Sequence, residues 1–153
     1  MEYNCNLSQK EAQPVLSIRS RSAVQGIPEL MGRSFGAVAQ YLGELGEAPA
    51  GMPFAAFYNM DVNDMDVEIG FPEGRVLPGR GEIQPGEIPA GWQASLLYVG
   101  RYDSMAPAYQ ALAEFVKTSG HEPTGVAYEM YLNDPSELSP EQAQTLIMFP
   151  LKS

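Results

Sequence analysis

Apolar residues recur along the chain with a helical period in two places. An apolar stripe with spacings of four, three, four and three residues runs from Met31 to Leu45. This spacing keeps the side chains on one face and predicts a helix over residues 29–45, which Gly46 ends. A second stripe begins at Met105 and predicts another helix, which Gly120 ends.

Shorter apolar or alternating segments predict strands, because successive side chains of a strand point to opposite faces. The expected strands cover residues 14–24, 54–58, 67–71, 92–99, 126–132 and 145–151. A helical turn is expected at 139–141, before the last strand, and residues 133–135 are expected to end the strand at 126–132. Residues 1–12 are polar and are predicted to form a loose leader, and the Pro- and Gly-rich residues 72–91 a link.

The two halves of the chain resemble each other at an offset of 74 residues. Residues 46–51 and 120–125 both follow the pattern G-x-x-P-x-G. Seven identities fall among the 26 positions of residues 26–51, where chance gives about two. A repeat of this length is one supersecondary unit that cannot bury its apolar face alone, so the two copies are expected to share a core.

Each half reads as strand, helix, strand, strand. Two βαββ units with short links favour a largely antiparallel sheet and an α+β fold. We therefore predict one domain over residues 1–153, with pseudo-repeats at about 14–71 and 88–151. Both helices are expected on one face of the sheet, and a ligand cleft on the other.

The formal net charge is −10, with nine Lys and Arg residues in all. Such a surface repels phosphate backbones, so no direct nucleic-acid partner is expected. The charge suits a cationic small molecule or a protein partner that normally holds DNA. It also has a simpler interpretation, in which acidity only keeps the protein soluble.

The ends and the cysteine content set the expected compartment. No apolar run approaches the length of a membrane-spanning helix, and the N-terminus lacks the pattern of a signal peptide. The single cysteine, Cys5, cannot form an intramolecular disulfide and is expected to be an inert thiol. A cytoplasmic location without membrane contact is the prediction.

Alternation along residues 126–132 singles out Glu129. Ala127, Glu129 and Tyr131 share one face of the predicted strand, and the other four residues of the segment share the opposite face. Those four residues are expected to form core beneath the helices, which places Glu129 on the face away from the helices. The offset matches Ala55 with Glu129 and Phe57 with Tyr131, so the carboxylate is a point at which the two copies differ.

A carboxylate on an apolar, aromatic-lined surface must be neutralised, hydrogen-bonded or functional. Glu129 is a candidate to bind a cation, or to act as a general base if its pKa is raised. Alternatively, Glu129 is only a half-exposed strand residue whose carboxylate forms a hydrogen bond with a neighbouring side chain. The candidate ligand-binding aromatics near the predicted strands are Phe57, Tyr58, Trp92 and Tyr131, whereas the helical Tyr109 and Phe115 are expected in the core.

The sequence offers little support for other chemistries. With one histidine, His121, and no cysteine cluster, there is no metal-ligand spacing and no Ser/His or Cys/His nucleophile pair. A phosphate-binding G-x-x-x-x-G-K-[ST] loop is also absent from the sequence. No metal and no cofactor are expected.

Three short segments resemble one known family. Residues 88–94 read I-P-A-G-W-Q-A, residues 99–102 read V-G-R-Y, and residues 128–135 read Y-E-M-Y-L-N-D-P. Together they resemble the GyrI-like family of effector-binding domains over about residues 14–152. The resemblance implies a duplicated βαββ fold with a small-molecule cleft between the copies. It also implies that Glu129 matches the central binding carboxylate of the family.

The family resemblance leaves several functions open. Members include ligand-sensing halves of transcription regulators, stand-alone multidrug-binding proteins, gyrase inhibitors, and hydrolases of cyclopropane-bearing compounds. The hydrolases resemble this chain in pairing a cleft Glu with aromatic residues. Only 13 residues precede the first predicted strand, so a DNA-binding region of the regulator type is not expected. Haem binding, known in a distantly related fold family, has no support beyond architecture.

Three hypotheses follow. The first is a stand-alone module that binds amphipathic, multi-ring or cationic compounds around Glu129. The second is a hydrolase of strained or electrophilic compounds that uses Glu129, with Tyr131, Tyr58 or Trp92 positioning the rings. The third is a protein-interaction role, such as inhibition of a topoisomerase through the acidic surface.

Overall fold

A computed structural model describes residues 3–133 and 139–152 of the chain. The predicted strand stop at Asp134 and Pro135 lies outside the described residues. The chain divides into two compact units, one of residues 12–89 and one of residues 1–11 with 90–153; we call them the 12–89 unit and the 90–153 unit. None of the helices in the described residues is long and apolar enough to cross a membrane.

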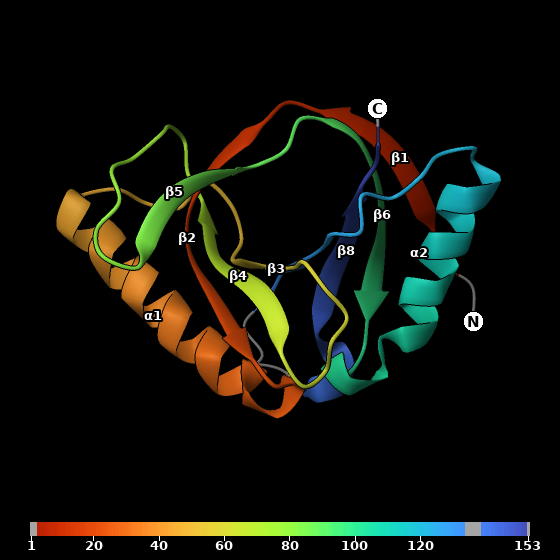
Figure 1. The fold of residues 1–153 in the computed structure, drawn as a ribbon, viewed down its shortest axis with the longest axis horizontal. Helices are drawn as coiled ribbons and strands as arrows, with labels where there is room; N and C mark the ends of the chain where they lie inside the picture. The colour runs from red at the N-terminus through yellow and green to blue at the C-terminus, as the bar shows by residue number, and fades with distance from the viewer. Residues whose placement is uncertain (1–2, 134–138, 153) are drawn as a thin grey trace. The chain divides into compact units, whose positions relative to one another are not determined.

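The 12–89 unit contains one long helix and four antiparallel strands of the sheet (Figure 1). The neighbouring strands in the sheet follow the order β3-β4-β2-β5. A short 3-10 turn, η1 (Val24–Gly26), leads into the helix. The elements are β2 (Gln13–Ser22), α1 (Ile27–Leu45), β3 (Phe54–Phe57), β4 (Met65–Pro72) and β5 (Ile83–Ile88).

The apolar stripe of α1 packs on one face of this sheet, as the spacing predicts. Val38 and Leu42 form a buried cluster with Leu16 and Ile18 of β2, because alternate residues of a strand share a face. Gly46 ends the helix in a left-handed conformation, with φ 72°, which glycine adopts without steric cost. This unit therefore has a core of its own.

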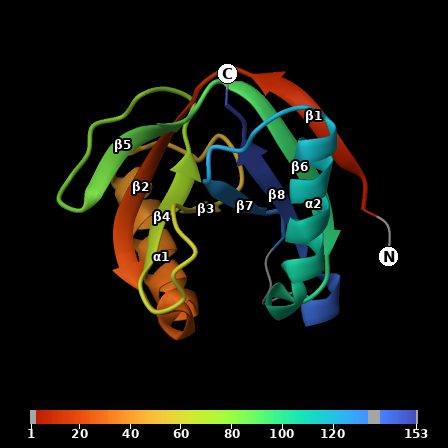
Figure 2. The same cartoon turned by 45° about the vertical axis from the view of Figure 1, so that its right-hand side comes forward.

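The 90–153 unit contains the second helix and four further antiparallel strands (Figure 2). Its neighbouring strands follow the order β1-β6-β8-β7. Residues of α2 form a buried cluster with residues of β6 and β8, such as Leu112 with Leu96 and Ile147. The elements are β1 (Cys5–Lys10), β6 (Gly91–Val99), η2 (Tyr102–Ser104), α2 (Ala106–Thr118), β7 (Ala127–Tyr131), η3 (Pro140–Gln142) and β8 (Gln144–Pro150).

The prediction of an α+β fold with an antiparallel arrangement and two helices is confirmed. The two units also share one strand register. In the first, Ile18 pairs with Ile69 and Ile69 with Ala55. In the second, Leu96 pairs with Ile147 and Ile147 with Glu129. Internal duplication predicts this correspondence, although duplication itself stays a prediction.

Two strands lie where the sequence predicts irregular chain. Residues 5–10 are not a loose leader, because they form β1 and pair with β6. Residues 72–91 are not only a link, because they contain β5, which pairs with β2. In both strands backbone pairing outweighs weak side-chain propensity. In β5 only Ile83 and Ile88, at the two ends, are buried, so no alternation marks it.

Candidate functional site

Glu129 lies at the centre of β7, on the sheet face that α2 covers. Its neighbour across the strands is Ile147, which is fully buried in the cluster with Leu112 of α2. Ala127, on the same side of β7, belongs to that cluster too. The expectation that Glu129 points away from the helices is therefore wrong. Alternation sorted the side chains of this strand correctly, but it cannot show which set faces a helix.

Two tyrosine hydroxyls hold the Glu129 carboxylate. Tyr131, two residues along the same strand, donates a hydrogen bond to Oε1 at 2.9 Å. Tyr109, from α2, donates to Oε2 through a short hydrogen bond. Each carboxylate oxygen thus has one hydroxyl donor, and the helix and the strand are joined through Glu129.

Burial and hydrogen bonding act on the Glu129 charge in opposite directions. Burial raises the pKa of Glu129 above its ordinary value, because it disfavours the charged form. The hydroxyls of Tyr109 and Tyr131 pull the pKa down, since they donate to the carboxylate. Burial, with the carboxylate as a further cause, raises the pKa values of both hydroxyls. Both tyrosines therefore stay protonated and act as donors.

Further aromatic rings lie beside the two tyrosines that hold this carboxylate. The ring of Tyr131 meets that of Tyr102 edge to face, with centroids 5.8 Å apart. The ring of Tyr109 lies 5.8 Å from that of Phe149 on β8. Tyr102 is 43% exposed, whereas Tyr131 is buried. The arrangement combines one carboxylate with several ring faces, which suits a ligand that has both a positive charge and rings.

The corresponding positions of the 12–89 unit carry a pair of rings at a similar distance but without the hydroxyl groups and the carboxylate. Phe35 on α1 lies 5.7 Å from Phe71 on β4, as Tyr109 lies beside Phe149. Ala55 and Phe57 stand in β3 where Glu129 and Tyr131 stand in β7. The carboxylate and both hydroxyls that hold it are therefore confined to one of the two units.

The other sequence-predicted aromatics have neighbours within their own units. Trp92 has His121 as its ring neighbour, at 6.0 Å. It stands four residues before Leu96, which is level with Glu129 in the sheet, and so about 13 Å away along the strand. Phe57 ends β3, opposite Val67. A ligand-binding role for Phe57, Tyr58 and Trp92 stays a prediction.

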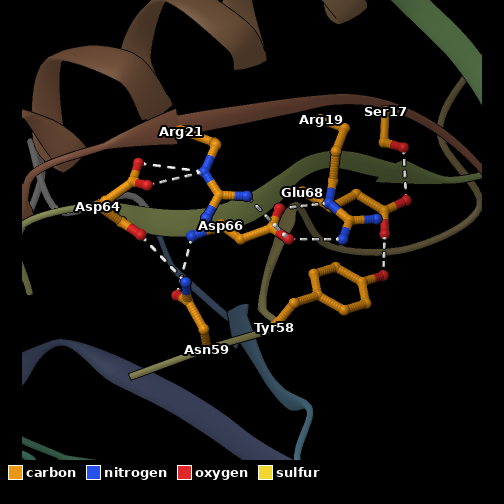
Figure 3. A network of polar contacts seen from close by, with 8 residues as sticks. All are labelled: Ser17, Arg19, Arg21, Tyr58, Asn59, Asp64, Asp66 and Glu68. Atoms are coloured by element: carbon orange, nitrogen blue, oxygen red, sulfur yellow. Dashed lines mark hydrogen bonds and ion pairs between the residues drawn. The ribbon is translucent and has the colours of Figure 1, made fainter. Parts of the chain in front are cut away.

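Tyr58 belongs to a different polar network, in the 12–89 unit. Its hydroxyl donates a short hydrogen bond to Glu68, and the guanidinium of Arg19 lies 3.7 Å from its ring centroid (Figure 3). Ser17 donates to the second oxygen of Glu68 at 2.6 Å. This network cannot be inferred from local sequence pattern, because its members come from three separate strands or their ends.

Sequence reasoning assigned Tyr109 to the core and missed its hydrogen bond to Glu129. Tyr109 does pack in the core, against Phe149. Its hydroxyl is the signal that was available, because a buried tyrosine needs a polar partner. Tyr102, 43% exposed in η2, was also not selected.

No group of three His, Cys, Asp or Glu side chains able to hold a metal ion is present in residues 3–133 and 139–152. Cys5 is partly buried in β1, and burial raises the pKa of its thiol. The chemistry of the site is therefore that of a carboxylate, tyrosine hydroxyls and aromatic rings.

The fold and the site together define a small α+β ligand-binding domain. The chain belongs to the GyrI-like family: a family model described as the GyrI-like small molecule binding domain matches residues 3–152. It is thus a GyrI-like small-molecule-binding domain. The family expected from three short motifs is confirmed. Among curated protein sequences, no significant match was found.

Solved structures share the fold at low sequence identity. EcmrR, in a cryo-EM structure with DNA, is 21% identical with a TM-score of 0.83; the match covers 99% of this chain but only 58% of that one. A hydrolase from Listeria innocua is 15% identical with a TM-score of 0.72, covering 97% of this chain and 91% of its own. SAV2435 bound to tetraphenylphosphonium is 13% identical with a TM-score of 0.68, covering 100% of this chain and 95% of its own.

Proposed function

We propose that this domain binds amphipathic compounds with several rings and a positive charge, and that Glu129 is the carboxylate that receives the charge. The observation that carries the proposal is the pair of tyrosine hydroxyls donating to Glu129 on the α2 face of the sheet. A carboxylate held in this way keeps its charge in an apolar setting more easily than one without donors.

The hydrogen bonds also bear on the type of ligand. Each carboxylate oxygen of Glu129 already accepts a hydrogen bond from a tyrosine hydroxyl. A cation without N–H groups can therefore pair with the charge of Glu129 without donating a hydrogen bond of its own. The rings of Tyr102, Tyr131 and Tyr109 add cation–π attraction. SAV2435, which shares the fold, is bound to such a cation, tetraphenylphosphonium. This likeness supports the same ligand class here.

Calorimetric titration tests the proposal. Tetraphenylphosphonium is compared with triphenylphosphine oxide, a neutral compound with similar rings. In Glu129→Gln, affinity for the cation falls roughly 10- to 150-fold, since a hydrogen bond or contact to a buried charge is worth about 1.5–3 kcal/mol. Affinity for the neutral compound changes less.

Glu114→Gln is the matched control, because Glu114 is an exposed carboxylate of α2. It should leave both affinities unchanged. Equal losses for the cation and the neutral compound in Glu129→Gln, or no loss for either, would overturn the assignment of Glu129.

A second candidate function is hydrolysis of strained or electrophilic compounds. Burial raises the pKa of Glu129, which favours a general base, and a hydrolase from Listeria innocua shares the fold. In this reaction Glu129 takes a proton from water while the water oxygen bonds to the electrophilic carbon. The strained bond to that carbon breaks, and the displaced atom takes up the proton.

Turnover measurements separate the two functions. If the protein hydrolyses such compounds, Glu129→Gln lowers turnover roughly 10²- to 10⁴-fold. Wild-type activity declines as the pH falls through the raised pKa of Glu129, because the base becomes protonated. If the wild-type protein binds such compounds but does not turn them over, the hydrolase function is rejected and the binding function remains.

Other expectations stay predictions. The comparisons give no support to a topoisomerase partner. Cytoplasmic location, a stand-alone state and multidrug breadth are likewise inferences from the sequence and the family. The hypothesis of a protein-interaction role through the acidic surface is tested by Glu129→Ala, since an effect of surface charge does not need a carboxylate held beneath a helix.

A further inference from the structure

Thr145 carries a buried hydroxyl beside the Glu129 site. The residue lies on β8, between β6 and β7 (Figure 2). Its side chain is 0% exposed, and its Oγ1 atom has no hydrogen-bond partner among the described residues. Buried polar groups are nearly always hydrogen-bonded, so each exception needs an explanation. A valine would fill the same space in a strand without leaving a hydroxyl unpaired.

The register of the strands fixes which way Thr145 faces. Thr145 pairs with Tyr131 of β7 on one side and with Tyr98 of β6 on the other. Residues paired across neighbouring strands project to the same face. Ile147, two residues further along β8, pairs in the same way with Glu129 and belongs to the cluster beneath α2. Thr145, Glu129 and Tyr131 therefore all lie on the face that α2 covers.

The tyrosine hydroxyls on either side of Thr145 have partners elsewhere. Tyr131 donates to Oε1 of Glu129, and Tyr98 donates to the backbone oxygen of Arg101 at 2.7 Å. The Thr145 hydroxyl can donate one hydrogen bond and accept two, and the described residues supply no partner for it. A group that comes from outside the chain can supply that partner.

The strand register also sets how far this hydroxyl lies from the carboxylate. Glu129 and Thr145 are diagonal neighbours, since Ile147 is the residue opposite Glu129. Diagonal neighbours in a sheet are about 7–8 Å apart between Cα atoms. A ligand that places its charge at Glu129 therefore reaches Thr145 with a group on the far side of one ring. The ring of Tyr102, which meets that of Tyr131 edge to face, is 43% exposed.

We propose that Thr145 is a specificity-determining residue of the ligand site, which hydrogen-bonds a polar group carried by the rings of the ligand. This inference rests on the proposed function and narrows it, because the favoured cations carry a hydroxyl or a similar group about one ring away from the charge. The ligand reaches Thr145 when the exposed ring of Tyr102 moves off Tyr131. The neutral hydroxyl of Thr145 distinguishes ligands of equal charge, which the charge of Glu129 cannot do.

Two phosphonium cations of matched shape test the proposal by calorimetric titration. One is [4-(hydroxymethyl)phenyl]triphenylphosphonium, and the other is (4-ethylphenyl)triphenylphosphonium, which has a methyl group where the first has its hydroxyl. Wild type binds the hydroxyl compound roughly 3- to 10-fold more tightly, the worth of one hydrogen bond. Thr145→Val removes this preference, whereas Thr145→Ser, which keeps a hydroxyl, retains it.

Thr118→Val is the matched control, because the exposed Thr118 of α2 donates its hydroxyl to the backbone oxygen of Phe115. This variant keeps the wild-type preference. Urea denaturation gives a second measurement. Thr145→Val unfolds at the same urea concentration as wild type or a higher one, since the substitution removes an unpaired buried hydroxyl. A lower midpoint means that the hydroxyl has a partner inside the protein, and overturns the proposal.

The outcomes separate this inference from the proposed function. Equal affinities of wild type for the two cations, or the same preference in wild type and Thr145→Val, overturn the role of Thr145 and leave cation binding standing. Glu129→Gln weakens the binding of both cations by a similar factor and keeps the preference, because it alters only the charge. If wild type binds neither cation, the proposed function fails and the role of Thr145 fails with it.

Discussion

The hydroxyl of Tyr109 on α2 donates a hydrogen bond to Oε2 of Glu129 on β7. This contact joins the helix to the sheet through the one carboxylate of that strand. Removing the hydroxyl leaves a partly buried carboxylate with a single remaining donor, Tyr131. The relationship makes the electrostatic state of Glu129 depend on a residue 20 positions away in the sequence.

Tyr109→Phe is expected to raise the pKa of Glu129 further. A hydrogen bond to a charged group is worth about 1.5–3 kcal/mol, so its loss corresponds to roughly one to two pKa units. NMR titration of carboxyl-labelled glutamate measures the shift. Tyr41→Phe is the control, because Tyr41 donates to the backbone oxygen of Pro78 and not to a carboxylate. A pKa of Glu129 that stays unchanged or falls would contradict the assigned contact.

Replacing Glu129 together with the two tyrosines that donate to it is expected to preserve the fold. The triple variant Glu129→Ala/Tyr109→Phe/Tyr131→Phe gives the 90–153 unit the side chains that Ala55, Phe35 and Phe57 supply in the other unit. Exchanging a partly buried polar network for apolar residues is often neutral or stabilising. Urea denaturation should show stability equal to or above that of wild type, while binding of tetraphenylphosphonium is lost. Unfolding of this variant together with retained stability in Glu129→Gln would contradict the correspondence of the two units.

Glu73, directly after β4, predicts a pH dependence of stability. It is 1% exposed, and neither carboxylate oxygen has a hydrogen-bond partner among the described residues. Burial, with a smaller effect of Glu47, raises the pKa of Glu73 from 4.5 to about 7. The folded state therefore holds a proton that the unfolded state releases at lower pH. Its contribution favours folding most below about pH 4.5 and is lost as the pH rises to about 7.

Glu73→Gln removes this loss of stability at higher pH, because the amide of glutamine stays neutral at every pH tested. The variant should gain stability over wild type at pH 8 and gain much less at pH 5, measured by urea denaturation at both values. Glu29→Gln, which alters an exposed glutamate of α1, should show no such difference. Equal effects of Glu73→Gln at the two pH values would show that Glu73 does not titrate between them.

Gly70 of β4 is expected to tolerate no side chain. A Cβ atom there would stand 2.0 Å from the carbonyl oxygen of Leu16 and 2.7 Å from Cα of Ser17. Both are backbone atoms of the paired strand, so they cannot move without breaking the ladder. Gly70→Ala should destabilise by about 3 kcal/mol or more. Gly74→Ala, where nothing lies within 4 Å of the added Cβ, should change stability little.

Internal duplication predicts that residues 14–71 superpose on residues 88–151. Phe57 and Tyr131 should then take equivalent places, and so should Met31 and Met105. Met31 lies within α1, whereas Met105 directly precedes α2. Helices that fail to coincide on superposition of the strands would remove the duplication.

Much of the fold follows from local pattern in the sequence. The apolar stripes predicted both helices, because burial of one face requires that spacing. For α1 the predicted start lies about two residues from the observed start, Ile27. Strong apolar strands such as β6 and β8 were predicted for the same reason. The importance of Glu129 could also be inferred, since a carboxylate among apolar and aromatic residues needs an explanation.

Tertiary structure alone decided three matters. It decided that residues 5–10 and 83–88 are strands, because edge strands gain their order from backbone pairing with β6 and β2, and not from their own side chains. It decided that Glu129 faces α2, because alternation separates two faces without identifying them. It also brought Tyr109 to Glu129 and Tyr58 to Glu68, since a hydrogen bond between two elements depends on how they pack, which no local period records.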